Sequence, residues 1–405
     1  MKHLIPLSII CLLISLTACQ QPAATNLAPP AQKNYVSDRL PQIKQFQQNL
    51  IDEGTAGGST ALVYKDGEVI YNETVNSGKT GDKDISPNTI FPIWSMSKPI
   101  TIVAIMTLFE EDKFLLSDPV SKYIPSMKSL MCKDENGRTY PCKNTLRIKH
   151  LLTHRSGWGY SLRKPDGTLL TVTDSIQKDL GEFMDILSTV PLSHEPGEKY
   201  TYGINTAVAG RLVEVISGKT FYEYLQEKVF GPLEMPNTKF YLSEQDREHF
   251  QPLYRTTDNG AGFDDGSHDE MGYDEKHRVY LGGEGMVSTL EDYSHFCEML
   301  LNEGVYNGNR VLSPATVKML HAPQSTEEEY GNNGMVMCYS FYSLESPEKY
   351  DFLAPKGIFG WSGYHNTHFW IDPANNLYGI FMTRRTPYSS GIGNRFRRAV
   401  YQAIL

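Results

Sequence analysis

The sequence is poor in cysteine and has no excess of positive charge. Six cysteines among 405 residues are too few for a disulfide scaffold, and none forms a Cys-x-x-Cys pair that could hold a structural zinc ion. The 47 Asp and Glu residues outnumber 38 Lys and Arg residues, and the net charge of −9 removes the electrostatic basis for binding a phosphate backbone. We therefore expect no nucleic-acid partner.

Several catalytic motifs are also missing. There is no Gly-x-Ser-x-Gly elbow of an α/β-hydrolase. There is no His-Glu-x-x-His or two-histidine carboxylate set, so we expect no metal and no cofactor. What is present is the composition of a folded globular protein, with 40% hydrophobic and 21% charged residues. The length predicts two or three cores, or one large composite domain.

The N-terminus predicts export. Lys2 and His3 precede an apolar stretch, residues 4–16, which is too short to cross about 30 Å of hydrocarbon as a helix. We predict a signal peptide over residues 1–18. The end of this segment, Leu16-Thr17-Ala18-Cys19, resembles the bacterial lipobox, in which the cysteine receives a lipid. The alternative is an ordinary secretory signal.

Residues 19–34 are rich in Pro, Ala and Gln and lack apolar periodicity, which predicts an extended tether. The lipobox resemblance implies that lipid on Cys19 anchors the protein to a membrane at the bacterial cell envelope, facing the periplasm. Gln20 in place of Asp favours the outer membrane in a host that has one.

Four cysteines remain after Cys11 leaves with the signal peptide and Cys19 takes the lipid. Cys132 and Cys142 flank a polar, turn-like insert, and an oxidising envelope favours a disulfide between them. The alternative is two free thiols. The remaining pair, Cys297 and Cys338, is expected to stay free.

Hydrophobic periodicity places the secondary structure at both chain ends. A helix is predicted over residues 35–50, and β-rich runs over residues 59–64 and 69–74 flank Asp66-Gly67, a strong hairpin signal. Near the C-terminus the pattern predicts strands and a last helix, over residues 335–343, 368–371, 377–383 and 392–404. The acidic stretch over residues 258–275 is predicted to be a solvated loop.

The simplest topology is an antiparallel sheet built from both chain ends and flanked by the terminal helices, with an all-helical domain inserted. This is an α/β (α+β) fold class. The sheet domain would comprise residues 35–93 and 330–405, and the mainly helical domain residues 94–329. The two parts would form one catalytic unit.

The pattern Ser-x-x-Lys occurs four times, and only Ser95 to Lys98 fits a catalytic pair. A buried apolar helix follows Ser95, and Pro99 is tolerated only near a helix start. The spacing puts the hydroxyl and the amine on one helix face, where Lys98 could take the serine proton. The other three matches lie in polar, loop-like sequence: Ser161 to Lys164, Ser175 to Lys178 and Ser346 to Lys349.

A family resemblance follows from five segments in order. The chain resembles the serine β-lactamase and penicillin-binding-protein superfamily, and more narrowly the class C-like branch that includes family VIII carboxylesterases. The segments that carry the resemblance are residues 89–101, 118–125, 151–157, 282–289 and 312–317. It implies a β-lactamase/DD-peptidase fold and an acyl-enzyme formed on Ser95.

The family's second element is a tyrosine that shuttles protons, and Tyr202 occupies that place, with Tyr200 as the alternative. The family pattern Tyr-x-Asn is broken here, because Asn205 comes one residue late; it is retained as a candidate substrate-binding residue. His154, in the Leu-Leu-Thr-His segment, is expected to be a structural, hydrogen-bonded histidine.

The third element is a strand that carries a cation in the family, and this chain reads Trp361-Ser362-Gly363-Tyr364 there. The resemblance assigns Trp361, Ser362 and Gly363 to substrate binding. The backbone N–H groups of Ser95 and Tyr364 would form the oxyanion hole. Without the cation the site loses its anchor for a substrate carboxylate.

Two more aromatic residues and two histidines are candidates for the site. Trp158 and Tyr160 could line an apolar acyl pocket or simply pack in the core. His365 and His368, three apart on a predicted strand, should point to opposite faces and so cannot chelate one ion. His365 could form part of the site wall.

Together these features predict a serine hydrolase for a small-molecule ester or amide, with carboxylesterase preferred. The alternatives are a class C-like β-lactamase, a D-amino-acid peptidase or DD-carboxypeptidase, and a non-catalytic lipoprotein that binds cell-wall peptide. The sequence carries no signal for a particular oligomeric state.

Overall fold

A computed structural model describes Met1 and residues 37–404, except residues 81, 165, 171–178, 258–259, 265–270, 275–278, 332 and 351–352. The predicted signal peptide, Cys19 and the tether therefore lie outside the described residues, apart from Met1. So do Ser175, Lys178 and half of the predicted acidic loop. Within the part described, no helix is both long and apolar enough to span a membrane.

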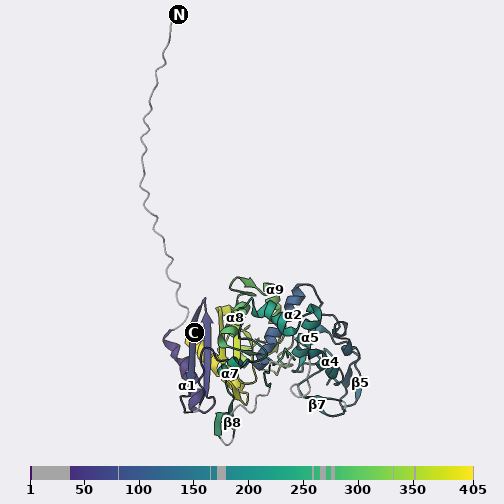
Figure 1. Cartoon of the computed structure of the whole chain (residues 1–405), viewed down its shortest axis with the longest axis horizontal. Coiled ribbons are helices and arrows are strands. Elements are labelled where there is room, and N and C mark those ends of the chain that lie inside the picture. Colours follow the sequence, from purple (N-terminus) through teal and green to yellow (C-terminus); the bar gives the residue numbers. More distant parts are fainter. Residues whose placement is uncertain are drawn as a thin grey trace. The chain divides into compact units, whose positions relative to one another are not determined.

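The body is organised around a seven-stranded antiparallel sheet built from both chain ends (Figure 1). The strand order is β13-β14-β15-β16-β17-β1-β2, so the last long strand of the chain pairs with the first. The strands are β1 (Gly58–Lys65), β2 (Glu68–Asn76), β13 (Met335–Met337), β14 (Tyr342–Leu344), β15 (Phe359–Ser362), β16 (His368–Asp372) and β17 (Leu377–Met382).

The predicted hairpin is confirmed, because Asp66 and Gly67 join β1 to β2 with positive φ angles of 52° and 95°. The single strand predicted over residues 335–343 is wrong. The chain turns between β13 and β14, where Cys338 N donates to Phe341 O and Ser340 has a positive φ. A turn of this kind is invisible in a continuous apolar run.

Helices cover both faces of the sheet. Neighbouring strand residues point to opposite faces, and in β16 Phe369 packs on Tyr293 of α8 (Leu290–Leu301). The next residue, Trp370, packs on Phe396 of α10 (Ser390–Ile404), which lies beside α1 (Pro41–Asp52). The predicted flanking by the terminal helices is thus observed. However, α8 belongs to the range 94–329 that we assigned to a separate helical domain.

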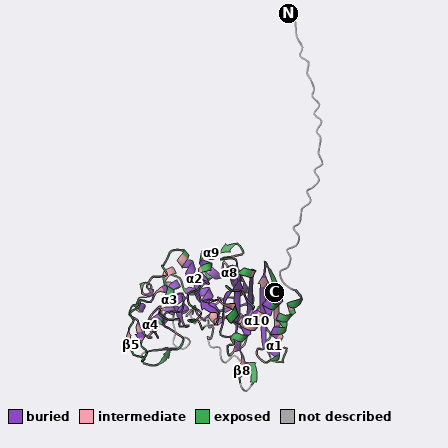
Figure 2. Ribbon diagram, turned by 180° about the vertical axis from the view of Figure 1, so that it is seen from behind, coloured by how far each residue is buried: buried purple, intermediate pink, exposed green. Residues whose placement is uncertain are grey.

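The rest of the body is mainly helical, and α2 lies at its centre (Figure 2). All residues of α2 from Ser97 to Leu108 are buried. The helices of this part are α2 (Ser97–Glu110), α3 (Ile148–Leu152), α4 (Leu180–Ser188), α5 (Asn205–Ser217), α6 (Phe221–Leu225), α7 (Glu244–His249) and α9 (Pro314–Leu320).

The prediction of an all-helical insertion is wrong, because short strands pair within its loops. Backbone groups in long loops need hydrogen-bond partners, and strand pairs of two to four residues supply them without an apolar alternation that a sequence would reveal. Within the insertion the pairs are β4 (Met131–Lys133) with β5 (Thr139–Pro141), β6 (Leu162–Arg163) with β7 (Leu169–Leu170), β8 (Tyr254–Thr257) with β9 (Gly260–Phe263), and β11 (Val305–Tyr306) with β12 (Asn309–Arg310). Two further pairs join the insertion to the ranges assigned to the sheet domain: β10 (Val287–Ser288) with β3 (Phe91–Pro92), and β8 with β18 (Arg385–Thr386).

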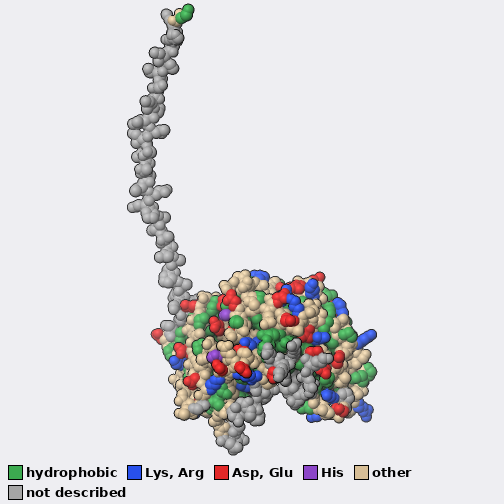
Figure 3. Space-filling model, viewed as in Figure 1, with side chains coloured by type: hydrophobic (Ala, Val, Ile, Leu, Met, Phe, Trp, Pro, Cys, Tyr) green, Lys and Arg blue, Asp and Glu red, His purple; other side chains and the backbone are tan. Residues whose placement is uncertain are grey.

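Acidic and basic side chains are interspersed over the described surface on the face drawn in Figure 3. This distribution agrees with the modest negative net charge of the chain.

Candidate active site

Ser95 lies on a single helical turn, Trp94–Met96, directly before α2. The residue before it, Trp94, has a φ of 46°, a left-handed conformation that a bulky residue seldom adopts. Backbone strain of this kind costs on the order of 1–3 kcal/mol and is concentrated at functional sites. The turn presents Ser95 at the N-terminal end of a buried helix, where the sequence placed it.

Lys98 is fully buried one turn along α2 and points back to Ser95. Its Nζ donates to Ser95 Oγ at 3.1 Å, to Tyr160 OH at 2.8 Å and to the Gly283 carbonyl at 2.6 Å. These three acceptors use all three N–H bonds of an ammonium group. Glu284 is the nearest carboxylate to this amine, with Oε2 at 3.6 Å.

Tyr202 completes the contacts of the serine. Its hydroxyl donates to Ser95 Oγ at 2.8 Å. Tyr200, the competing tyrosine of the sequence, packs its ring 5.4 Å from that of Tyr330 instead. Ser95 Oγ is therefore within hydrogen-bond distance of both Lys98 and Tyr202, the two groups expected to move its proton.

His154 lies behind Tyr202, with the ring centroids 4.9 Å apart. Asn205 Nδ2 is 3.2 Å from His154 Nδ1, and Ser340 Oγ is 3.1 Å from Nε2. An amide N–H can only donate, so Nδ1 accepts and Nε2 carries the proton in this network. Complete burial and the nearby charge of Lys98 lower the pKa of His154 well below its usual value. It is a neutral, structural histidine.

Tyr160 lines the cavity, which is one of the two places predicted for it, and it also contacts Lys98. About two fifths of the residue is exposed to the cavity, but its hydroxyl points inward to Lys98. Burial of that hydroxyl, together with the charge of Glu284, raises the pKa of Tyr160 well above its usual value. The phenol therefore stays protonated beside the catalytic pair.

Two predicted substrate-binding residues lie outside the cavity. Trp158 is 1% exposed and its Nε1 donates to the Val190 carbonyl at 3.0 Å. Asn205 is fully buried as the first residue of α5, with its amide directed at His154 and at the Trp158 carbonyl. This asparagine, which comes one position later than in the family pattern, is already part of the helix.

Glu284 is a site residue that sequence reasoning missed. The segment Gly282-Gly283-Glu284-Gly285 packs tightly against α2, where a Cβ at Gly283 would lie 3.4 Å from Lys98 Nζ. The signal was present in the sequence, because the family segment has glycine where this chain has Glu284.

The end of β15 lies beside the serine. Gly363 allows this approach, because a Cβ there would be 2.3 Å from the Ile93 carbonyl. His365 Nδ1 accepts a 2.9 Å hydrogen bond from Trp94 Nε1, and the Trp94 and Tyr364 rings meet edge to face at 5.4 Å. The segment that bears Tyr364 is thus held against the turn that bears Ser95, as an oxyanion hole requires.

The two candidate histidines, His365 and His368, are both buried. His365 lies in the turn between β15 and β16, not on the strand predicted there, and does not line the cavity; it supports Trp94. His368 begins β16. Burial and nearby arginines lower the pKa of each to about 3, so both are neutral.

These elements surround a cavity of about 670 Å³. Eight of its lining side chains are aromatic, and none of the described lining residues is Lys, Arg or His. The cavity is lined by Trp94, Ser95, Tyr160, Tyr200, Tyr202, Glu284, Tyr330, Trp361, Ser362, Gly363, Tyr364 and Tyr388.

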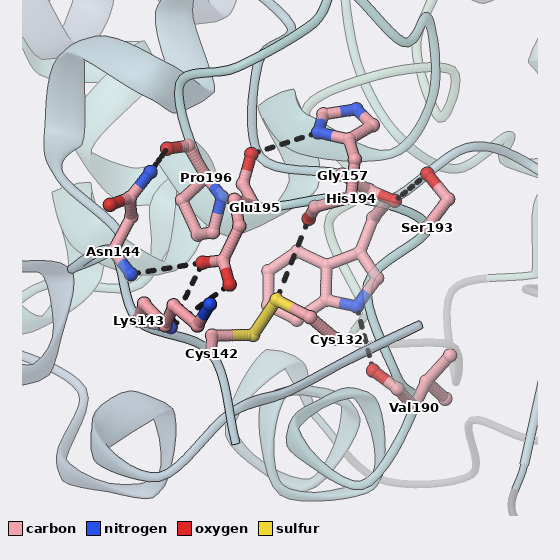
Figure 4. The surroundings of a disulfide bond; sticks show 11 residues. Cys132, Cys142, Lys143, Asn144, Gly157, Val190, Ser193, His194, Glu195 and Pro196 are labelled. Atoms are coloured by element: carbon pink, nitrogen blue, oxygen red, sulfur yellow. Dashed lines mark hydrogen bonds between the residues drawn. A yellow bond between two sulfur atoms is a disulfide. The ribbon is translucent and has the colours of Figure 1, made fainter. Parts of the chain in front are cut away.

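A disulfide supports the loop that leads to Tyr202 (Figure 4). It joins Cys132 in β4 to Cys142 after β5, with the Cα atoms 5.1 Å apart. The next two backbone N–H groups, of Lys143 and Asn144, donate to the Glu195 carboxylate at 3.0 and 2.9 Å. Cys297 and Cys338 are free and buried.

The other Ser-x-x-Lys sequences within the described residues do not form such a site. Ser346 and Lys349 both donate to the Glu327 carboxylate at the surface. Ser161 and Lys164 flank β6 (Leu162–Arg163) of a small hairpin.

The family model described as Beta-lactamase matches residues 43–403. The chain belongs to the beta-lactamase family. The match includes the Ser95 turn, the Tyr202 loop and β15, so this beta-lactamase-family protein is a serine hydrolase by its family. The predicted β-lactamase/DD-peptidase fold is confirmed.

Two relatives of this beta-lactamase-family protein match over most of their length. An uncharacterised protein of Mycobacterium tuberculosis (strain CDC 1551 / Oshkosh) is 28% identical over 84% of this chain and 88% of its own. A protein of Escherichia coli O157:H7 named "Putative D-alanyl-D-alanine carboxypeptidase" is 26% identical over 96% of this chain and 91% of its own.

Solved structures of the same fold are similar over 90% of the chain. One is EstCE1, described as a hydrolase with promiscuous acyltransferase activity, with a TM-score of 0.78, 23% identity and 99% of its chain covered. Another is simvastatin synthase (LovD) from Aspergillus terreus, with a TM-score of 0.75, 19% identity and 98% covered. At these identities the likeness shows the fold alone.

Proposed function

We propose that this protein is a carboxylesterase that works through an acyl-enzyme on Ser95. The observation that carries the proposal is the position of Ser95 Oγ, which is 3.1 Å from Lys98 Nζ and 2.8 Å from Tyr202 OH at the edge of a cavity. A serine hydroxyl in contact with two groups that can take and return its proton can act as a nucleophile. The neighbouring N–H groups of Ser95 and Tyr364 would stabilise the oxyanion.

The reaction runs in two halves. Once Lys98 has given up one of its three protons, Ser95 Oγ bonds to the ester carbonyl carbon as the serine proton passes to Lys98 Nζ, directly or by way of Tyr202. The same proton then goes to the departing alcohol, which restores the neutral amine. Water then attacks the acyl-enzyme and gives a proton to the neutral Lys98 amine. That proton is passed to Ser95 Oγ as the bond between the serine oxygen and the acyl carbon breaks, which releases the acid and restores the serine. Tyr160, which keeps its proton, holds Lys98 in place throughout.

The lining of the cavity supports an ester over a β-lactam or a peptide C-terminus. Both of the latter carry a carboxylate, which a cation anchors in the family, and Trp361 stands where that cation would be. None of the described lining residues supplies another cation, and Glu284 would repel a carboxylate. The second candidate is a DD-carboxypeptidase, which the name of the Escherichia coli relative favours.

One assay separates these functions. Protein lacking residues 1–19 is incubated with p-nitrophenyl butyrate, a chromogenic cephalosporin and a peptide ending in D-Ala-D-Ala, and is labelled with a fluorophosphonate. We expect the ester to be turned over fastest, with label and turnover lost in Ser95→Ala. The matched control, Ser346→Ala, removes a serine of the same motif at the surface and keeps both. Faster turnover of the cephalosporin or the peptide would overturn the esterase proposal, and absent labelling would favour a binding protein.

We also propose that lipid on Cys19 anchors the protein at the envelope. Membrane and soluble fractions are compared for the full chain, for Cys19→Ser and for Cys11→Ser. The first substitution should release the protein, and the second should not, because it changes a cysteine outside the lipobox. Membrane association that survives Cys19→Ser would contradict lipid anchoring.

A further inference from the structure

The carboxylate of Glu284 is a charged group in the cavity without a donor. The residue is only 5% exposed and lines the same cavity as Ser95. Neither Oε1 nor Oε2 accepts a hydrogen bond from any described residue. A buried carboxylate without donors is costly, so a ligand that brings N–H groups to it is favoured.

Lys98 does not satisfy this carboxylate. Its Nζ lies 3.6 Å from Glu284 Oε2, which is an electrostatic contact rather than a hydrogen bond. The three hydrogens of the amine are directed at Ser95, Tyr160 and the Gly283 carbonyl. The lysine therefore balances charge nearby but leaves both carboxylate oxygens of Glu284 buried and without a hydrogen-bond donor.

The rest of the cavity suits a cation. Eight aromatic side chains line it, and the face of an aromatic ring attracts an ammonium group. The described lining contains no positively charged side chain. The nearest cation is Lys98, which is fully buried behind the lining and 3.6 Å from Glu284 Oε2. A carboxylate among aromatic rings is the chemistry that recognises amines.

A substrate amine bound to Glu284 would lie close to the carbonyl group that Ser95 attacks. Ser95 Oγ is 3.1 Å and Glu284 Oε2 is 3.6 Å from the same Lys98 Nζ, so the two oxygens are separated by at most the sum of these distances. The attacked carbon lies about 3 Å from the serine oxygen. An amine hydrogen-bonded to Glu284 can therefore be carried by the carbon next to that carbonyl.

We propose that Glu284 binds the protonated amine of the substrate, and that the preferred substrates are esters of α-amino acids with a free amino group. This inference rests on the proposed function. Ser95 Oγ replaces the alcohol on the acyl carbon, the alcohol leaves with a proton, and water releases the amino acid. The amine keeps all its bonds and serves only to bind.

The test compares two esters that differ only in the amine. The value of kcat/KM is measured at pH 6.5, where an α-amino group is mostly protonated, for methyl alaninate, as D and L isomers, and for methyl propionate. The quantity compared is kcat/KM for methyl alaninate divided by kcat/KM for methyl propionate. This ratio is measured in the wild type, in Glu284→Gln and in Glu284→Asp. Because it is a ratio within each variant, a general loss of activity cancels. We expect it to fall about tenfold in Glu284→Gln for at least one isomer, and to be largely kept in Glu284→Asp.

A binding measurement does not depend on turnover. n-Propylammonium is titrated calorimetrically into Ser95→Ala and into the double variant Ser95→Ala, Glu284→Gln, with circular dichroism to check folding. We expect binding that weakens at least fivefold in the double variant. An equal ratio of the two esters in wild type and Glu284→Gln, or equal propylammonium binding, would overturn the role of Glu284. If the wild type hydrolysed neither ester in a Ser95-dependent way, the proposed function itself would be overturned.

Discussion

The hydroxyl of Tyr202 donates a 2.8 Å hydrogen bond to Ser95 Oγ across 107 positions of sequence. The serine comes from the turn before α2, and the tyrosine from the loop before α5. The contact depends on His154, whose neutral ring supports Tyr202 from behind. Proton transfer therefore depends on how precisely these two helix starts are held together.

Removal of the Tyr202 hydroxyl should lower activity more than removal of the Tyr160 hydroxyl. We expect Tyr202→Phe to lower kcat for p-nitrophenyl butyrate by about 10²- to 10⁴-fold, because it deletes the group that contacts the nucleophile. Tyr160→Phe, the matched control, should lower kcat by about tenfold, since Lys98 loses one acceptor but keeps its contact with Ser95. A greater loss in Tyr160→Phe would assign the shuttle to Tyr160.

Gly363→Ala should impair the oxyanion hole while the fold persists. The added Cβ would lie 2.3 Å from the Ile93 carbonyl and so push the Tyr364 segment away from Ser95. We expect kcat to fall about a hundredfold, the loss typical for one oxyanion donor. Gly262→Ala is the matched control, because a Cβ there meets nothing within 4 Å. Unchanged kcat in Gly363→Ala would exclude this segment from the oxyanion hole.

Acid should destabilise the protein partly through His365. Burial and the charges of Arg384 and Arg255 lower its pKa to about 3 in the folded protein, whereas the unfolded chain takes up the proton near pH 6.5. Its contribution to stability is complete above pH 6.5 and is lost as the pH falls from 6.5 towards 3. The slope in this window is at most about 1.4 kcal/mol per pH unit.

His365→Gln keeps an acceptor for Trp94 Nε1 but cannot titrate. Urea unfolding at several values between pH 7.5 and 4 should therefore show a shallower loss of stability in the variant than in the wild type. Parallel curves would show that His365 is not the group that couples acid to unfolding.

The disulfide should contribute to stability more than to chemistry. Replacement of both Cys132 and Cys142 by serine should lower the free energy of unfolding by about 2–4 kcal/mol, because the unfolded chain gains freedom. It should also loosen the Glu195 contacts that precede Tyr202, with a smaller effect on kcat than Tyr202→Phe. Cys297→Ser serves as the control for a buried thiol outside the hairpin. Equal unfolding midpoints with and without reductant in the wild type would contradict this prediction.

Local sequence was a good guide to elements with a strong period. The β1–β2 hairpin and α10 are found close to their predicted ranges. The break between β13 and β14 and the small hairpins of the loops were missed. Their backbone is set by hydrogen bonds to distant segments, such as that of Tyr339 N to the Leu320 carbonyl, which no short window contains.

The candidate pair Ser95 and Lys98 could be found from the sequence alone, since both lie on one helix turn and their spacing is a local property. The sequence also indicated Tyr202 and the uncharged Trp361 segment through their order along the chain. It could not decide which side chains face the cavity, because that depends on how loops pack against α2 and the sheet. Tertiary structure buries Trp158 and Asn205 in the core. It also directs the Tyr160 hydroxyl to Lys98 and brings Glu284 next to the Lys98 amine. Each of these orientations is set by partners more than thirty residues away, which compete for a limited number of donors and acceptors in a buried space.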